Sequence, residues 1–301
     1  MALKGLDIFK LSPKKNCKEC GSPTCMAFCM KVAQGAVSID KCPYFSDDAK
    51  AMLNEQTAPP MKTIHIFTME LTRVSPDYLP MTRRHADIIE TALRRHNPDT
   101  HVKLYDVTAL YEQHLKQNAN EGCYCSPYTL LRLLADLLPL PDKLLYLDAD
   151  IMVCKDIGLL YGLDVEAVEY AAARDHYGKY LINPNYINAG VLLFNMKLCR
   201  ETGIFEKARA LIRTKKLMFA DQSALIRSTT SRRLLPQRFN DQKFLHSHTV
   251  IRHFSKRLFY TPYPHTENIK QWQAEKVHKR FGYTCFDDIL NEYLSIKENL
   301  Q

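Results

Sequence analysis

The sequence predicts an α/β fold with a mostly parallel sheet, preceded by a small cysteine-rich segment. From residue 62 onward, runs typical of strands alternate with runs at helical spacing, which is the pattern of α/β domains. Two of the strands, KLLYL at 143–147 and GVLLFN at 190–195, are almost wholly apolar, as strands buried on both faces of a sheet are. Near the N-terminus cysteines dominate instead, with four of them between Cys17 and Cys29.

The individual elements are expected in a definite order. KTIHIF at 62–67 is rich in β-branched and aromatic residues and predicts the first strand. Residues 82–97 place apolar side chains at helical spacing and predict the first helix of the α/β part. The other expected elements are a strand at 101–107, a helix at 126–138 capped by Ser126, a helix at 197–214, a helix beginning at Asp221, a strand ending at His253 and a helical tail from 265.

Composition and length bound the class of protein. The chain has 301 residues, of which 46% are hydrophobic and 25% charged, as in ordinary globular domains. It contains no run of about 18 apolar residues and no apolar signal core, so we expect a cytoplasmic protein with reduced thiols. Pro59-Pro60 fits neither a helix nor a central strand. We therefore expect a cysteine-rich domain at 1–57, a linker at 58–61 and an α/β domain with a basic helical tail at 62–301.

Positive charge is concentrated in the last third of the chain. The net charge is +8, and the segment from Lys197 to Arg280 holds 19 Lys and Arg against 6 Asp and Glu. A basic surface of this kind suits a nucleotide, an anionic glycolipid or a membrane face. A solvated basic face that keeps the protein soluble is the alternative.

The N-terminal cysteines have the spacing of a metal or cluster site. Four of them form a C-x2-C-x4-C-x16-C pattern followed directly by Pro43: Cys17, Cys20, Cys25 and Cys42. Thiolates at short spacing converge on a soft metal centre, and a cysteine followed by proline commonly closes an iron–sulfur ligand set. Structural zinc sites also use four cysteines, and spacing alone leaves zinc open. We interpret Cys29 as a packed neighbour of the ligands.

Residues 3–57 resemble the small [4Fe-4S] domain at the N-terminus of the large subunit of corrinoid iron–sulfur proteins, and the likeness includes all four of these cysteines. The resemblance implies a [4Fe-4S] cluster. It does not imply corrinoid chemistry, because nothing downstream resembles a corrinoid domain.

A second candidate site follows the apolar strand at 143–147. Asp148 and Asp150 in YLDADIMV are two residues apart, so on an extended chain both carboxylates point to one side. Two adjacent carboxylates repel each other unless a cation holds them, and hard oxygen ligands select Mg²⁺ or Mn²⁺. Such a metal can bridge a diphosphate. Two solvated carboxylates at a turn are the alternative.

Three later stretches carry further polar candidates. Asn188 and Ala189 precede Gly190 at the start of an apolar strand, where the missing side chain leaves room for a ligand. Asp221 and Gln222 begin a helix, where an aspartate is also simply favourable. His253 ends an alternating strand and has a nitrogen suited to the same metal, although a lone histidine is more often structural.

Taken in order from about 62 to 263, these stretches resemble glycosyltransferase family 8, whose members are retaining, Mn²⁺-dependent transferases with a nucleotide-diphospho-sugar (GT-A-like) fold and UDP-sugar donors. The resemblance implies that Asp148, Asp150 and His253 bind the metal. It places Asp221 at the sugar hydroxyls and Gln222 beside the anomeric carbon. It also assigns substrate-binding roles to Arg132, Ala149, Asn188 and Ala189.

The match to this family is incomplete in two places. Thr68 and Met69 stand where an aspartate and an aromatic residue usually meet the uracil, with Glu70 or Asp77 as uncertain substitutes. After His253 the usual glycine and lysine are replaced by Lys256 and Phe259. Lys256 or Arg257 is then the candidate cation for the diphosphate, and a flexible basic loop is the alternative.

The function expected from these observations is transfer of a hexose from UDP-glucose or UDP-galactose, with retention, to a cell-surface glycan or glycolipid such as lipopolysaccharide. Because Gln222 is a neutral amide and a poor nucleophile, we favour same-face attack, with a covalent route through Asp221 left open. We expect peripheral contact with the inner membrane face and no nucleic-acid partner. The alternative is a redox-responsive protein that binds a nucleotide sugar without turnover.

Overall fold

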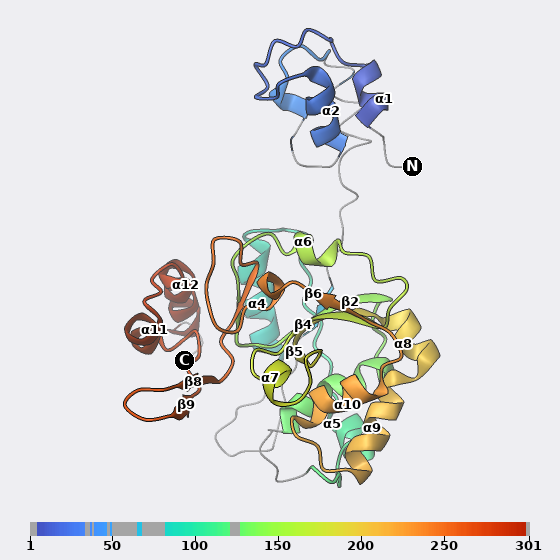
Figure 1. The fold of residues 1–301 in the computed structure, drawn as a ribbon, viewed down its shortest axis with the longest axis vertical. Coiled ribbons are helices and arrows are strands. Elements are labelled where there is room, and N and C mark those ends of the chain that lie inside the picture. The colour runs from blue at the N-terminus through green and yellow to red at the C-terminus, as the bar shows by residue number, and fades with distance from the viewer. Residues whose placement is uncertain are drawn as a thin grey trace. The chain divides into compact units, whose positions relative to one another are not determined.

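The computed structural model of the chain describes residues 5–33, 37, 39–46, 49, 65–67, 82–120 and 127–298. The chain divides into two compact units, Met1–Thr63 and Ile64–Gln301 (Figure 1). The predicted linker at 58–61 lies outside the described residues, so the predicted domain boundaries stay predictions. Among the described helices, none combines the length and the apolar character needed to cross a bilayer.

The first unit is small and built from short helices. These are α1 (Gly5–Lys10), α2 (Cys25–Ala33) and the 3₁₀ turn η1 (Ile39–Lys41). Its core contains seven buried side chains, two of them cysteines: Ile8, Phe28, Cys29, Val32, Ile39, Cys42 and Phe45. Domains of this size commonly need a metal or another cross-link in addition to the apolar core, which agrees with the expected cluster.

The second unit is organised around a five-stranded sheet. The strand order is β1-β2-β5-β4-β6, with β1 at Ile66–Phe67, β2 at Lys143–Leu147, β4 at Tyr170–Arg174, β5 at Ile187–Asn195 and β6 at Arg232–Leu235. The pairs β1–β2 and β4–β6 are parallel, whereas β5 is antiparallel to both of its neighbours. Four of these strands therefore run in one direction, as predicted, and β5 alone runs against them.

Both faces of the sheet are buried, which explains the apolar strand sequences. Leu144 and Tyr146 of β2 belong to one core, while Leu145 and Leu147 belong to the other. The first core is covered by η2 (Pro127–Leu137), α8 (Met196–Thr202), α9 (Ile204–Thr214) and α10 (Ala220–Ser228). The second is covered by α6 (Gly158–Tyr161), η3 (Gln237–Phe239) and β7 (Ile251–His253). The two helical layers lie on opposite sides of the sheet (Figure 1).

Two charged side chains fix the helical layer that faces the site. The guanidinium of Arg209 on α9 donates to both carboxylate oxygens of Asp136 on η2, at 2.5 and 2.9 Å. Paired arginine–carboxylate bonds of this kind define orientation as well as contact. This pair holds η2, which carries Arg132, against the rest of the layer.

The other elements lie around this centre. They are α4 (Arg83–Arg94), α5 (Thr108–His114), β3 (Ile151–Val153), α7 (Gly178–Leu181), β8 (Arg257–Phe259), β9 (His265–Glu267), α11 (Ala274–Phe281) and α12 (Asp287–Glu298). A separate small core of Phe254, Ile269, Val277 and Phe286 packs the C-terminal segment onto the domain.

Most of the predicted elements are confirmed, with three differences. The predicted strand at 101–107 is wrong, because Val102 N–H donates to the Glu90 carboxylate at 3.0 Å instead of to a neighbouring strand. The predicted helix at 197–214 is divided at Gly203, whose φ of 66° ends α8. The tail contains β9 before its helices. The cap predicted at Ser126 lies outside the described residues.

Candidate active site

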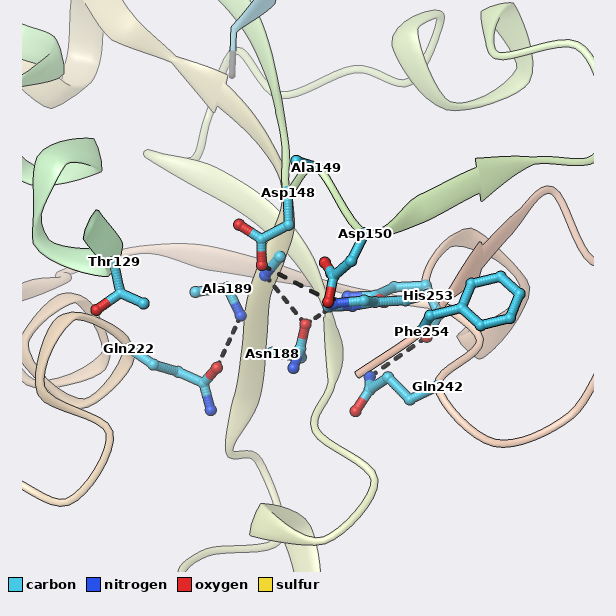
Figure 2. Close-up of polar contacts among 12 residues, drawn as sticks. Thr129, Asp148, Ala149, Asp150, Asn188, Ala189, Gln222, Gln242, His253 and Phe254 are labelled. Carbon is cyan, nitrogen blue, oxygen red and sulfur yellow. Dashed lines mark hydrogen bonds and ion pairs between the residues drawn. The ribbon is translucent and has the colours of Figure 1, made fainter. Parts of the chain in front are cut away.

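Three predicted metal ligands meet at one edge of the sheet. Asp148 and Asp150 lie in the turn between β2 and β3, and the antiparallel pairing of β3 with β7 sets Ile151 opposite His253. One ligand atom from each of Asp148, Asp150 and His253 lies within 4.8 Å of the others (Figure 2). The Nε2 atom of His253 is 3.2 Å from Asp150 Oδ1 and 3.9 Å from Asp148 Oδ2.

Gly190 makes this convergence possible. It lies on β5 beside the end of β2, and its carbonyl oxygen accepts a bond from Asp148 N–H at 2.8 Å. A Cβ atom at this position would lie 2.3 Å from His253 Cε1 and 2.6 Å from Asp148 Oδ2. The missing side chain of Gly190 was predicted to leave room for a substrate or other ligand. The room is instead filled by the side chains of His253 and Asp148, two of the predicted metal ligands.

A chain of side-chain hydrogen bonds orients the histidine. The Asp175 carboxylate accepts from Asn188 Nδ2 at 2.9 Å, and Asn188 Oδ1 accepts from Asn240 Nδ2 at 2.9 Å. Asn240 Oδ1 then lies 3.0 Å from His253 Nδ1. Because a carboxylate only accepts, the first bond assigns the amide orientation of each asparagine in turn. We call this series, Asp175–Asn188–Asn240–His253, the amide relay.

The amide relay determines which histidine nitrogen can bind a cation. An amide oxygen only accepts, so Nδ1 of His253 carries a hydrogen and Nε2 is the ring nitrogen that faces the two aspartates. A lone pair facing two carboxylates is unfavourable unless a proton or a metal ion lies between them. One imidazole nitrogen and two carboxylate oxygens, with the second nitrogen held by an outer partner, fit a divalent cation such as Mn²⁺.

The Arg132 guanidinium forms ion pairs both with Asp148 of the metal site and with Asp221 at the start of α10. It is buried, and its guanidinium lies 3.0 Å from Asp148 Oδ1 and 3.1 Å from Asp221 Oδ2. It also donates to the Ala189 carbonyl oxygen and stacks over the Tyr146 ring. Burial alone would lower the pKa of Arg132, but the two carboxylates and Tyr146 raise it, so the cation is retained. Burial raises the pKa of Asp221, and Arg132 opposes that rise.

The side chain of Gln222 on α10 contacts the backbone of Ala189 on β5. The predicted helix start is confirmed, since α10 begins at Ala220. The Gln222 amide oxygen accepts from the backbone N–H of Ala189 at 2.9 Å (Figure 2). Asn188, Ala189, Asp221 and Gln222 are all buried. The structure therefore brings these four predicted residues together, while Ala149 is exposed in the turn between the aspartates.

A lysine from the C-terminal segment also reaches the metal site. The Lys270 ammonium contacts Asp150 Oδ2 and donates to the Phe254 carbonyl oxygen at 3.1 Å. Gln271 donates to the Ala149 carbonyl oxygen at 2.8 Å. Burial would raise the pKa of Asp150, but His253 and Lys270 lower it below its ordinary value. A cation thus faces the carboxylate that is predicted to hold the metal.

The predicted diphosphate cations lie further along the same segment. Lys256 is exposed, and Arg257 begins β8 with its guanidinium over the Phe259 and Phe281 rings, 5.5 and 5.0 Å from their centroids. Thr68, Met69, Glu70 and Asp77, the candidates for contact with the base, lie outside the described residues.

Sequence reasoning missed four polar residues of the site, Tyr146, Asp175, Asn240 and Lys270. A signal existed for Tyr146, because it is two residues before Asp148 and its hydroxyl donates to Asp148 Oδ1 at 2.6 Å. Asp175, Asn240 and Lys270 belong to no recognisable motif. Only the fold brings them to the aspartate pair.

The cysteine segment has the features of a ligand loop. Cys17 is exposed, Cys20 is partly buried, and Cys25 and Cys42 are buried. The Asn16 backbone N–H donates to Cys25 Sγ at 3.3 Å. Positive φ angles occur at Lys14, Asn16, Lys18 and Gly21. Such angles are strained for residues other than glycine and commonly mark a functional loop.

Cys29 differs from the four predicted ligands. It is fully buried, and burial together with Cys25 and Cys42 raises the pKa of its thiol to about 11. Cys29 and Cys42 share the core of the first unit. A neutral buried thiol is inert, in agreement with its interpretation as a packed neighbour.

Comparison with protein families identifies both units. The model of glycosyl transferase family 8 matches residues 51–240, and the chain belongs to this family. A model of an Fe-S cluster domain matches residues 13–44, so the first unit is an iron–sulfur domain. The family 8 match ends before His253 and Lys270, whose positions at the site come from the structure.

Individual relatives align with separate parts of the chain. Residues of this chain are 53% identical over 64 positions to the corrinoid/iron-sulfur protein large subunit of Moorella thermoacetica, covering 21% of this chain and 14% of that subunit. They are 32% identical over 112 positions to glycosyltransferase GlyA of Streptococcus pneumoniae, covering 36% of this chain and 15% of that protein. The chain thus spans only a small part of these curated relatives.

A solved structure of the WbbM bifunctional glycosyltransferase covers 70% of this chain and 44% of its own, with 20% identity and a TM-score of 0.49.

Proposed function

We propose that the second unit transfers a hexose from UDP-glucose or UDP-galactose to a glycan or glycolipid, with retention and with the help of Mn²⁺ or Mg²⁺. The observation that carries this proposal is the convergence of Asp148, Asp150 and His253, with Nε2 of the histidine directed at the two carboxylates. Membership of family 8 supports transfer between a sugar donor and an acceptor.

The residues around the site have distinct parts in the proposed reaction. A divalent cation held by Asp148, Asp150 and His253 would neutralise the charge of the departing diphosphate. Arg132 holds Asp148 and Asp221 in fixed positions, so little reorganisation is needed when charge develops on the sugar. Asp221 and Asn188 provide hydrogen-bonding groups for sugar hydroxyls. Lys270 provides a further cation beside Asp150, with Lys256 as the other candidate for the diphosphate.

The hydrogen bond that Gln222 accepts supports a mechanism in which the acceptor attacks the anomeric carbon from the face that the diphosphate leaves. Its amide oxygen already accepts a hydrogen bond from Ala189 N–H, which makes an intrinsically poor nucleophile poorer. In the proposed step, the bond from the anomeric carbon to the diphosphate oxygen breaks and a bond to the acceptor oxygen forms. The acceptor proton passes to the departing UDP oxygen. A glycosyl-enzyme trapped on Asp221 and detected by mass spectrometry would contradict this route.

Replacement of Asp150 by alanine tests the transferase proposal. Wild-type protein, purified without oxygen, is expected to release UDP from UDP-glucose or UDP-galactose only when Mn²⁺ or Mg²⁺ is present. Asp150→Ala should lower that rate roughly a hundredfold or more, as loss of one charge-stabilising group commonly does. Asp99→Ala removes an exposed aspartate and should leave the rate unchanged. If wild type neither releases nor binds UDP with Mn²⁺, a binding or redox-sensing role would replace this proposal.

We further propose a [4Fe-4S] cluster on Cys17, Cys20, Cys25 and Cys42. Cys25→Ala should remove most of the iron and sulfide that anaerobically purified protein contains, because a cluster requires all its thiolates. Cys29→Ala, a matched change of a buried neighbouring thiol, should leave both contents unchanged. Zinc in place of iron in the wild type, or iron loss in Cys29→Ala, would contradict the assignment.

The proposed acceptor is a cell-surface glycan or glycolipid, such as lipopolysaccharide, that is assembled at the cytoplasmic face of the inner membrane. The excess of Lys and Arg between Lys197 and Arg280 supports contact with an anionic surface. The half-exposed ring of Trp272 in the same region supports it as well.

A further inference from the structure

A pocket with a basic and aromatic lining lies beside the candidate active site. Its volume is about 490 Å³, within the range of small-ligand sites. His176 and Tyr177 contribute from the segment before α7 and Tyr180 from α7 itself, while Lys243 and Arg257 contribute from two later segments. None of the nine residues that line the pocket is acidic.

Among the residues that the structure describes, no anion pairs with the cations of this pocket. Within the described part of the chain, the Lys243 ammonium and the Arg257 guanidinium make only ring contacts, Lys243 with Phe244 at 5.1 Å and Arg257 chiefly with Phe281. The carboxylate of Asp175, directly before His176, is already bonded to Asn188 and to two backbone N–H groups. The pocket is therefore a region of uncompensated positive charge.

Three chain segments connect this pocket to the amide relay. His176 follows Asp175 directly, Lys243 is three residues after Asn240, and Arg257 is four residues after His253. Four residues span at most roughly 14 Å. Two further bonds hold the lining together: His176 N–H donates to Gln242 Oε1 at 2.8 Å, and Leu258 N–H donates to the Tyr177 hydroxyl at 2.9 Å. The lining of the pocket is thus tied to the same three segments that carry the amide relay.

We propose that this pocket holds a phosphate group carried by the acceptor, so that the acceptor is an anionic, phosphorylated saccharide. The inference rests on the proposed transferase function and specifies its substrate class. Lysine and arginine are the side chains that bind phosphate oxygens most strongly, and the aromatic walls provide the apolar surface typical of small-ligand sites. With the phosphate held here, a hydroxyl of the same molecule is presented toward the sugar donor.

Calorimetric binding to the full-length, Mn²⁺-loaded protein with UDP present tests the proposal, with glucose 6-phosphate, glucose and inorganic phosphate as probes. Glucose 6-phosphate is expected to bind at least about tenfold more tightly than either other probe, because it joins a charged group to a sugar. Lys243→Gln should weaken glucose 6-phosphate binding about tenfold, whereas Lys243→Arg, which keeps the positive charge, should bind it about as tightly as wild type. Lys216→Gln, a change of an exposed lysine elsewhere, should have no effect.

Two results would overturn the proposal. One is equal binding of glucose and glucose 6-phosphate, or unchanged binding in Lys243→Gln. The other is equal binding of inorganic phosphate and glucose 6-phosphate, which would make the pocket a site for the free ion. UDP binding is measured in the same samples. Its absence in wild type would be a failure of the transferase proposal, and the probes are then titrated without UDP to judge the pocket separately.

Discussion

Replacement of Gly190 by alanine adds only one methyl group and is expected to lower metal-dependent activity about a hundredfold. The added Cβ would lie 2.3 Å from His253 Cε1, whereas carbon atoms in contact are ordinarily about 3.5–4.0 Å apart. His253 or the strand must therefore move by roughly 1 Å, a displacement that can lower catalysis about a hundredfold. Mn²⁺ affinity by calorimetry and UDP release together measure the effect.

A matched glycine change separates this effect from a general loss of stability. Gly162→Ala affects an exposed position after α6 with φ of −71°, which alanine adopts without strain. It should retain wild-type Mn²⁺ affinity. Thermal unfolding of the metal-free Gly190→Ala protein confirms that the fold persists. Unchanged Mn²⁺ affinity in a folded Gly190→Ala protein would refute the assignment of His253 and Asp148 as metal ligands.

Replacement of Asn240 by leucine is expected to lower Mn²⁺ affinity by about 10- to 100-fold, the usual cost of losing the outer partner of a metal-binding histidine. Leucine cannot accept a bond from His253 Nδ1, so the ring loses the contact that directs Nε2 to the aspartates. Asn240→Asp keeps an acceptor there and should retain more of the affinity. Nitrogen NMR of the metal-free protein reads the tautomer of His253 directly.

The control for this variant is another buried asparagine. Asn120 is also almost fully buried, and it holds the end of α9 through the carbonyl oxygens of Ile212 and Lys215. Asn120→Leu should lower the free energy of unfolding without altering Mn²⁺ affinity or the His253 tautomer. If both leucine variants lose the metal equally, the loss reflects stability, and the amide relay does not orient the histidine.

The parts of the site that could be predicted are those that one short segment specifies. Asp148 and Asp150 follow a buried strand directly, so their place at its carboxyl end was readable, although they lie in a turn and not on the extended chain that the spacing argument assumed. His253 could be proposed because it ends a strand. The role of Asn240 was not readable, because it depends on the pairing of β3 with β7 and on the amide of Asn188, contacts that join distant segments.

The fold was predictable to a similar extent and for similar reasons. The wholly apolar strands were identified because they are buried on both faces. The direction of β5 was not, since antiparallel pairing with β2 leaves no mark on so apolar a sequence. At 101–107 the alternating sequence predicted a strand that does not form. A strand needs a neighbouring strand to hydrogen-bond its backbone groups, and here the backbone N–H of Val102 donates to the Glu90 carboxylate instead.

The pairing of β5 with β2 has a consequence for which sequence changes this site tolerates. Five residue pairs from Lys143–Asn195 to Leu147–Val191 set the register, and the next position brings Gly190 beside Asp148. Insertion of one residue within β5 would shift this register, so that a residue with a side chain would replace Gly190 beside Asp148 and His253, where no Cβ atom fits. Active variants of this chain should therefore tolerate insertions and deletions only in the connecting loops, and the number of residues from Gly190 to Asn195 should stay constant.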